Sequence, residues 1–184
     1  MAALSTAAWV AHDLGMAVGV GGSLFGRTAL EPSVRNISNR NERGEVINDA
    51  WRRFGAIQLA SLGMMAATWL AGRLSLTGRR LNASARGLVV AKDVLVGASL
   101  ASAIGAAVTG NKLAAQRESG GVARDDDGEV SIDSPDQIRR LGRLTDAFGL
   151  LNLIAGAGVI AVTTVLAMSA GRSARWSVRR RVLP

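Results

Sequence analysis

The stretch that decides the fold is Ala147–Gly171, AFGLLNLIAGAGVIAVTTVLAMSAG, which contains no acidic or basic residue. Phe54–Gly72, Val94–Asn111 and Leu14–Gly26 are equally free of charge. A helix needs about 20 apolar residues to cross the roughly 30 Å hydrocarbon core of a bilayer. The pattern therefore predicts an all-α fold: a four-transmembrane-helix bundle within residues 1–171, with spans at about 6–26, 54–72, 87–109 and 147–169.

The composition agrees with a membrane location. Of 184 residues, 48% are hydrophobic but only 4% are aromatic, and 22 are glycine. Glycine is disfavoured in soluble helices, whereas in membranes it allows helices to pack closely. The net charge of +8 is better explained by basic segments beside anionic lipids than by a nucleic-acid partner, because no RNA-binding signature occurs. The chain has no cysteine, which excludes disulfides, thiolate metal sites and a cysteine nucleophile.

Polar segments separate the predicted spans. Residues 33–43 read as a loop, and Glu45 is predicted to begin the second helix ahead of its span. Residues 112–133 form a polar acidic loop that lacks the spacing of a calcium-binding EF-hand. Ser134 followed by Pro135 is typical of a helix start and predicts the beginning of the fourth helix.

Basic residues predict the orientation. The short segment 73–86 and the tail 172–184 carry only basic charges and would share one side of the membrane. The first and third loops hold more Lys and Arg in total, but acidic residues offset them and the rule works best on short segments. We therefore expect a multi-pass protein of the cell inner membrane with both termini in the cytoplasm. The tail arginines are expected to contact anionic lipid headgroups: Arg172, Arg175, Arg179, Arg180 and Arg181.

Small residues recur at helical spacing in spans one and three. Such residues let helix backbones approach closely, so they predict tight contacts, either inside the bundle or with a second copy or another membrane subunit. The positions are Gly15, Gly19, Gly22 and Gly26 in span one, and Gly97, Ala101 and Gly105 in span three.

Two ionisable pairs, His12-Asp13 and Lys92-Asp93, lie at equivalent depths in spans one and three. Ionisable groups inside a span are costly, so we predict that the four side chains form one polar cluster. The cluster serves either as structural pairing or as a ligand or proton site, since histidine titrates near neutral pH. A single histidine without cysteine makes a metal or haem site implausible, and no cofactor is expected.

The two pairs also predict an internal repeat. Residues 11–14 and 91–94 match in pattern, and Arg52-Arg53 and Arg139-Arg140 precede the second span of each half. The pattern suggests a duplicated helical hairpin. Asp146 and Asn152, in the fourth helix, are candidates for polar contacts between helices, although Asp146 near the membrane surface is equally explained by solvent or by pairing with Arg143.

Residues Leu14–Pro32, a glycine-rich span followed by a proline, resemble the first span of small four-span bacterial membrane proteins of unknown function. Fungal anthrone oxygenase relatives share the outline. The resemblance implies one possible activity, a membrane oxidoreductase acting on a lipophilic substrate, and carries no catalytic residues. The residues themselves contain no recognisable catalytic motif and favour a non-catalytic accessory subunit of a larger membrane assembly. The alternative is a small transporter or proton pathway that uses the His12, Asp13, Lys92 and Asp93 cluster.

Overall fold

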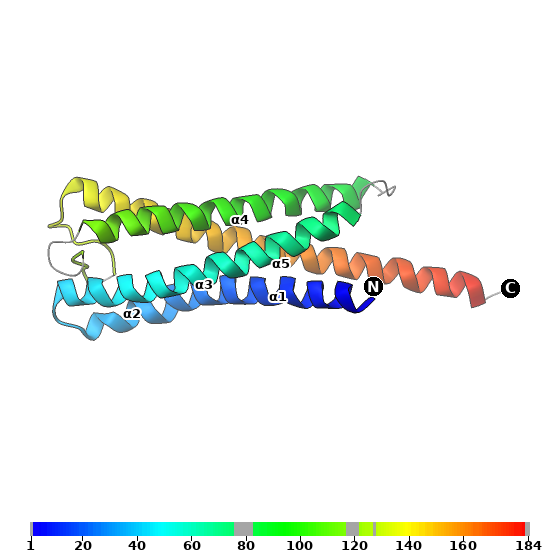
Figure 1. Cartoon of the computed structure of the whole chain (residues 1–184), viewed down its shortest axis with the longest axis horizontal. Coiled ribbons are helices and arrows are strands. Elements are labelled where there is room, and N and C mark those ends of the chain that lie inside the picture. Colours follow the sequence, from blue (N-terminus) through cyan, green and yellow to red (C-terminus); the bar gives the residue numbers. More distant parts are fainter. Residues whose placement is uncertain (1, 76–82, 117–121, 127, 183–184) are drawn as a thin grey trace.

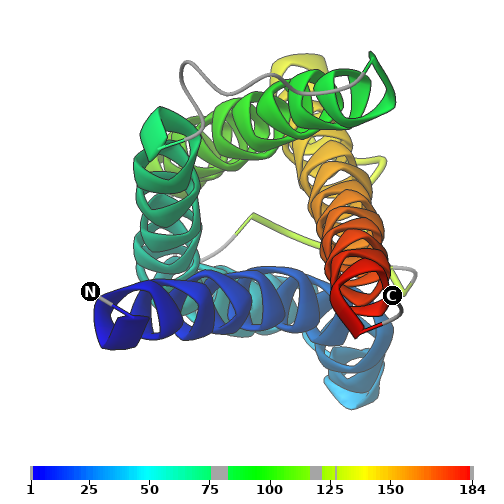
Figure 2. The same ribbon diagram turned by 90° about the vertical axis from the view of Figure 1, so that its right-hand side faces the viewer.

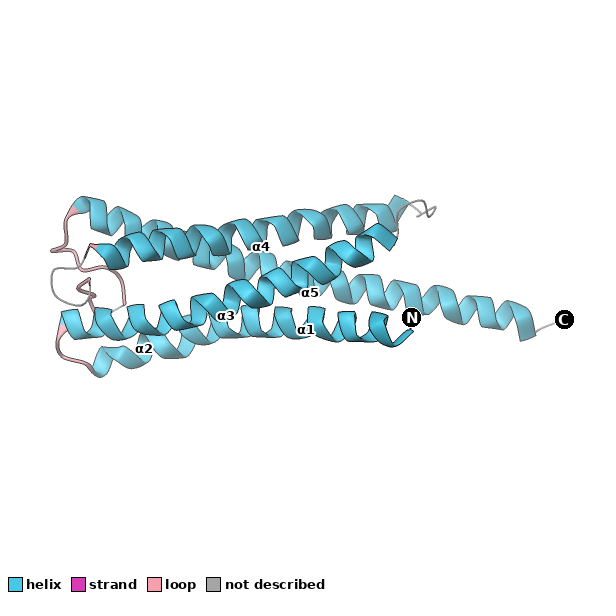
Figure 3. Cartoon of the chain, viewed as in Figure 1, coloured by secondary structure: helices cyan, strands magenta, loops and turns pink. Residues whose placement is uncertain are grey.

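The computed structural model describes residues 2–75, 83–116, 122–126 and 128–182. The chain there forms four long helices, α1 Ala2–Phe25, α3 Arg40–Ser75, α4 Ala83–Ala115 and α5 Asp136–Val182. They run alternately up and down (Figure 1) and form a ring when viewed end-on (Figure 2). The described connections gather at one end, called here the loop end, and both chain termini lie at the opposite, terminal end (Figure 3).

The all-α prediction is confirmed for the described part of the chain, which has no named strand and a single isolated bridge between Arg124 and Val130. Three helices are long and apolar enough to cross a membrane: Arg40–Leu74, Ala83–Ala115 and Asp136–Ser169. These helices contain the second, third and fourth predicted spans. α1 does not meet the same measure, because its polar pair and its glycines dilute its apolar content.

Several helix boundaries differ from those expected from the sequence. α3 begins at Arg40 rather than Glu45, because the Asn39 side chain accepts a hydrogen bond from the backbone N–H of Asn41 at 3.0 Å and so caps the helix. α4 continues to Ala115, so the first residues of the expected 112–133 loop are helical. α5 continues through Val182, and the expected tail is therefore largely the end of this helix, since no proline interrupts it.

The first helix does not stop at Gly26. It continues through a π-helical turn, Gly26–Leu30, the short helix α2 Glu31–Ser33 and a 3-10 turn, Val34–Asn36. The Glu31 N–H donates to the carbonyl of Gly26, five residues earlier. Pro32 offers no N–H, and its ring would collide with a carbonyl one tight turn before it, so a wider turn relieves the conflict.

The helices associate as two hairpins. α1 packs mainly against α3, and α4 mainly against α5, while α1 and α4 lie on opposite sides of the ring (Figure 2). A buried apolar core, which includes Met16, Leu62, Met65, Val96 and Val159, fills the interior toward the terminal end. The arrangement agrees with two equivalent hairpins, and their origin by duplication stays a prediction.

Candidate functional site

The glycines predicted in span one face α3. A Cβ on Gly15 would lie 2.5 Å from the backbone oxygen of Ser61, and a Cβ on Gly22 would overlap the ring of Phe54. Gly19 and Gly26 similarly lie against Leu62 and Trp51 of α3. In α4, Gly105 lies against Phe148 of α5, whereas Gly97 has no neighbouring atom within 4 Å of a built Cβ and is exposed, as is Ala101.

Three of the four predicted polar residues come together at the terminal end. Lys92 is fully buried, and its Nζ lies 4.1 Å from the ring centre of Trp69 and 5.8 Å from that of Trp9. His12 is also buried, and its Nδ1 lies 3.2 Å from the carboxylate of the largely exposed Asp13. The ammonium of Lys92 thus rests on aromatic rings, which attract a cation through their negative faces.

Asp93 takes a different partner from the one expected. Its Oδ1 accepts a hydrogen bond from Trp69 Nε1 at 2.8 Å, and its Oδ2 pairs with Arg73 Nε at 3.3 Å. Asp93 therefore joins α4 to α3 at the terminal end, while Lys92 points into the interior. These contacts account for both residues as packing between helices, and a proton or ligand role for the cluster stays a prediction.

A polar belt of four side chains, one from each long helix, crosses the middle of the bundle. Gln58 Nε2 donates to Ser23 Oγ at 2.7 Å and to Asn152 Oδ1 at 2.9 Å, and Asn152 Nδ2 donates to the backbone oxygen of Ser99 at 2.7 Å. Asn152 is buried, so the belt is shielded from solvent. The polar contact between helices predicted for Asn152 is present.

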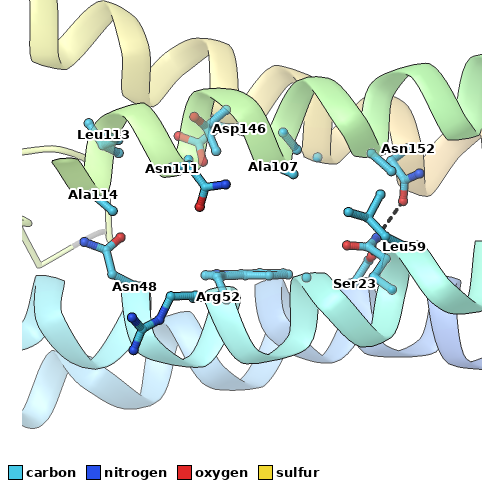
Figure 4. A pocket seen from close by; sticks show the side chains of 18 of the residues that line it. Ser23, Asn48, Arg52, Leu59, Ala107, Asn111, Leu113, Ala114, Asp146 and Asn152 are labelled. Atoms are coloured by element: carbon cyan, nitrogen blue, oxygen red, sulfur yellow. Dashed lines mark hydrogen bonds between the residues drawn. The ribbon is translucent and has the colours of Figure 1, made fainter.

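Between the belt and the loop end lies a cavity of about 370 Å³. In Figure 4, α3 and α4 form opposite walls, with Asn48 and Arg52 on one and Ala107 and Asn111 on the other. Small apolar residues line much of the rest, namely Gly55, Ala56, Ala103, Ala106, Gly110 and Ala114. A volume of several hundred Å³ with a few polar groups is typical of a small-molecule site.

Five ionisable side chains line this cavity: Arg27, Glu31, Arg52, Arg124 and Asp146. Arg52 is exposed and pairs with Asp49, which leaves the other four as the charged group of the cavity. In the described chain no salt bridge within 4.0 Å joins any two of them. Arg27 donates instead to the backbone oxygen of Asp146 at 2.6 Å. Arg124 is buried and the other three are half-buried. Charges withdrawn from water without an ionic partner are costly, so their presence around one cavity marks a candidate site.

Local structure explains how these groups reach the cavity. Arg27 and Glu31 lie on the π-helical turn and the helix that follows it, and Trp51 Nε1 donates to Glu31 Oε1 at 3.2 Å. Burial raises the pKa of Glu31, and the positive charges of Arg124 and Arg27 oppose the shift only in part. Burial likewise lowers the pKa of Arg124, which is 7% exposed.

Arg124 belongs to a turn, residues 122–131, that crosses the loop end of the ring (Figure 2). The turn is closed by a bond from Ser131 N–H to the Ala123 oxygen at 2.9 Å, and Gly128 has a positive φ of 86° that favours glycine. This segment carries the acidic run that was expected to be a solvated loop. Arg40 and Arg43 hold it to the start of α3 by pairing with its carboxylates.

Arg43 makes the tightest of these attachments. The side chain is buried, and it donates to the backbone oxygens of Ile37 at 2.9 Å and Arg124 at 3.2 Å and pairs with Asp126 at 2.7 Å. A hydrogen bond from the Ile132 N–H lowers the pKa of the neighbouring Asp125. The turn is therefore anchored over the loop end and presents Arg124 to the cavity.

Sequence reasoning missed most of this site. From the sequence, Arg27 lies just past the first predicted span, and Asp146 is explained by contacts between helices, by solvent or by pairing with Arg143, whereas in the structure both line the cavity. One sequence signal could have pointed to the site: Arg27 and Glu31 lie just before Pro32, in the first connection. The described residues contain no cluster of three metal-ligating side chains. The tail arginines predicted to contact lipid headgroups lie on the last turns of α5, where side chains are outside the described part of the structure. Arg79 and Arg80, in the basic segment 73–86, lie outside the described residues altogether.

Comparisons with protein-family models, with curated proteins and with solved structures find no match for this chain.

Proposed function

We propose that this chain is a four-span integral membrane protein that binds a small molecule in the cavity at its loop end. Besides the three spans in α3, α4 and α5, we take α1 as a span. Its 24 residues extend about 36 Å at about 1.5 Å per residue, enough to cross a hydrocarbon core of roughly 30 Å. Its exposed side chains include Leu14, Leu24 and Phe25, while the polar His12 is turned inward.

The position of α1 in the ring supports the same conclusion. It lies antiparallel to α3, its glycine face packs against α3, and it also contacts α5. α3 and α5 carry apolar side chains on their outer surfaces too, such as Ile57, Leu70 and Ile154. If these helices lie in a bilayer, α1 lies there with them, and both termini share one side.

Labelling of single cysteines tests the topology, because the chain has none of its own. Ala7→Cys lies near the start of α1 and Asn36→Cys in the first connection, and both native residues are exposed. In intact cells an impermeant thiol reagent should label Asn36→Cys and leave Ala7→Cys unlabelled, which places the termini in the cytoplasm. Equal labelling of both positions before permeabilisation would contradict four spans.

The ligand-binding proposal is carried by one observation: the four ionisable groups that line the cavity besides Arg52 form no salt bridge with each other within 4.0 Å in the described structure. A bound molecule would supply the missing partners, and the small side chains on α4 leave room for it. The test is a pair of variants at neighbouring positions, Ala107→Phe, which fills the cavity, and Val108→Phe, which adds the same ring on the exposed face. Native mass spectrometry of protein extracted in mild detergent should show a bound small molecule with wild type and Val108→Phe but not with Ala107→Phe.

An accessory role in a larger membrane assembly is the second candidate. The supporting observation is the exposed small-residue face of α4 at Gly97 and Ala101, beside the exposed Val94 and Ile104. A second membrane helix packs closely on such a face. Cross-linking of a cysteine at Gly97 to a second copy or another subunit in native membranes would support it, and only monomeric protein would count against it. Transport, proton conduction and oxidoreductase activity stay predictions.

A further inference from the structure

The cavity has a direction as well as a volume. Its charged groups, Arg27, Glu31, Arg124 and Asp146, lie toward the loop end. Toward the middle of the bundle its lining is uncharged: Leu59 and Ala103 form an apolar wall, and the polar belt, whose side chains are hydrogen-bonded to one another, ends the cavity. From Asn48 to Leu59 the cavity follows α3 for about 16 Å at about 1.5 Å per residue. The lining therefore passes from charged to uncharged along the same axis as a lipid held in one leaflet does.

Three sides of the cavity are closed. At the loop end, Val122 lies against Gly44, and the turn that contains Arg124 crosses the ring (Figure 2). Toward the middle, the belt residues Gln58 and Asn152 are hydrogen-bonded to one another. The paired faces of each hairpin close the back.

The fourth side lies between α3 and α4. Their side-chain contacts, such as Trp69 with Asp93, are at the terminal end. Toward the loop end the two helices diverge, and the close-up looks between them into the cavity (Figure 4). Arg52 and Asn111, which line the cavity at this opening, are exposed. In a four-span protein this opening faces the interfacial region of the bilayer rather than bulk water.

The charges also constrain the occupant. Besides Arg52, which is exposed and pairs with Asp49, two guanidinium groups and two carboxyl groups line the cavity. Arg124 is 7% exposed; its Nη1 donates to the backbone oxygen of Gly128, and its Nε lacks a hydrogen-bond partner in the described structure. A purely anionic or purely cationic ligand would pair with two of these groups and leave the other two facing a like charge. A ligand with both charges and no net charge satisfies all four.

We propose that the cavity binds a zwitterionic amphiphile from the bilayer, with its headgroup among Arg27, Glu31, Arg124 and Asp146 and its chain along Leu59 and Ala103 toward the opening between α3 and α4. This inference rests on the proposed ligand-binding function and adds the class of ligand and its route. The acidic part of the headgroup lies beside the arginines, and the ammonium beside the carboxylates.

Three probes separate the contributions of charge and chain. Decanoyl lysophosphatidylethanolamine has both charges and a chain, decanoyl lysophosphatidylglycerol has the chain and only a negative charge, and glycerophosphoethanolamine has the zwitterionic head alone. Each is titrated into full-length protein in a non-ionic detergent, with binding followed by native mass spectrometry. We expect the first probe to bind about tenfold or more tightly than either of the others, as loss of one charged hydrogen-bond partner alone has an effect of that size.

Variants assign the binding to the cavity. Glu31→Gln keeps an acceptor for Trp51 and removes one charge, and Arg124→Gln removes one of the opposite sign; each should weaken the first probe by about tenfold. Arg53→Gln is the matched control, because Arg53 is an exposed arginine at the same end that pairs with Asp49. Its affinity should equal that of wild type. If Arg124→Gln fails to fold, Glu31→Gln still tests the assignment.

The possible failures are distinct. Equal binding of glycerophosphoethanolamine, or stronger binding of the lysophosphatidylglycerol, would overturn the zwitterionic amphiphile while leaving a cavity ligand in place. If Ala107→Phe bound all three probes as well as Val108→Phe does, binding would lie outside the cavity, and both this inference and the proposed function would be wrong.

Discussion

Single residues in this bundle carry costs that the helices around them offset. Glu31 is partly buried beside an apolar wall and is hydrogen-bonded to Trp51, yet its charge has no direct ionic partner in the described structure. Sites of this kind are kept for function rather than for stability. Asn152, by contrast, stabilises the bundle, because each of its hydrogen bonds to Gln58 and Ser99 joins one helix to another.

Glu31→Gln should change how stability depends on pH. Because burial raises the pKa of Glu31, the folded state binds the proton more tightly than the unfolded state, and stability falls as pH rises from the ordinary pKa of 4.5 through the raised one. Above that window the variant should exceed wild type by up to about 1 kcal/mol, and below it the two should be equal. Thermal unfolding in detergent from pH 4 to pH 8 measures the difference, and a constant offset at all pH values would show that Glu31 is not the titrating group.

Asn152→Leu should destabilise the bundle. The change breaks the bonds to Gln58 and Ser99 and leaves the Gln58 amide short of a partner, at a cost of about 1 kcal/mol or more. Leu151→Ala, on the exposed surface, is the control and should have a smaller effect. Thermal unfolding of the two proteins compares them. An Asn152→Leu protein as stable as wild type would mean that the belt contributes nothing.

At the scale of elements, the sequence predicted what depends on local pattern. Runs without charge located α3, α4 and α5, and glycine spacing identified the face of α1 that meets α3. The cavity was not predictable in this way. It depends on which side of each helix turns inward and on Arg124, which a turn far along the chain brings beside Arg27 and Glu31. Nothing in the local sequence of an acidic loop distinguishes a buried arginine from a solvated one.

Two glycine-to-alanine substitutions test which face of α1 packs against α3. Gly15→Ala places a methyl group 2.5 Å from the rigid backbone oxygen of Ser61 and should cost about 1–3 kcal/mol. Gly21→Ala, where nothing lies within 4 Å, should be neutral or stabilising by up to about 1 kcal/mol, because alanine is the better helix former. Unfolding temperatures in detergent measure both. Equal effects of the two substitutions would mean that α1 turns a different face toward α3.

The anchored turn gives a second prediction at this scale. Arg43→Gln removes the donors to the Ile37 and Arg124 oxygens and the pair with Asp126, so the segment should detach more often. Protease cleavage within residues 122–131 should become several-fold faster, in proportion to the more populated open state. Arg35→Gln, at an exposed position nearby, should leave the rate unchanged. Cleavage at the wild-type rate in Arg43→Gln would contradict the anchoring role.

The whole molecule is asymmetric along its axis. The terminal end is sealed by an apolar core and by Lys92 resting on Trp69, whereas the loop end holds a charged cavity beneath an anchored turn. Large apolar side chains are exposed on all four long helices, as a membrane location requires. Together these features agree with the proposed bilayer protein, whose loop end would bind a ligand and whose terminal end is packed.

The most direct measurement is the rate at which a small water-soluble thiol reagent modifies single cysteines in protein solubilised in mild detergent and freed of bound lipid. Ala107→Cys lines the cavity, Val108→Cys is exposed on the outer surface of α4, and Val159→Cys lies in the fully buried core. An emptied cavity that is open between α3 and α4 predicts rapid modification of Ala107→Cys and slow modification of the other two, since detergent covers one and packed side chains cover the other. If Ala107→Cys reacted no faster than Val159→Cys, the cavity would not exist and the account would be wrong.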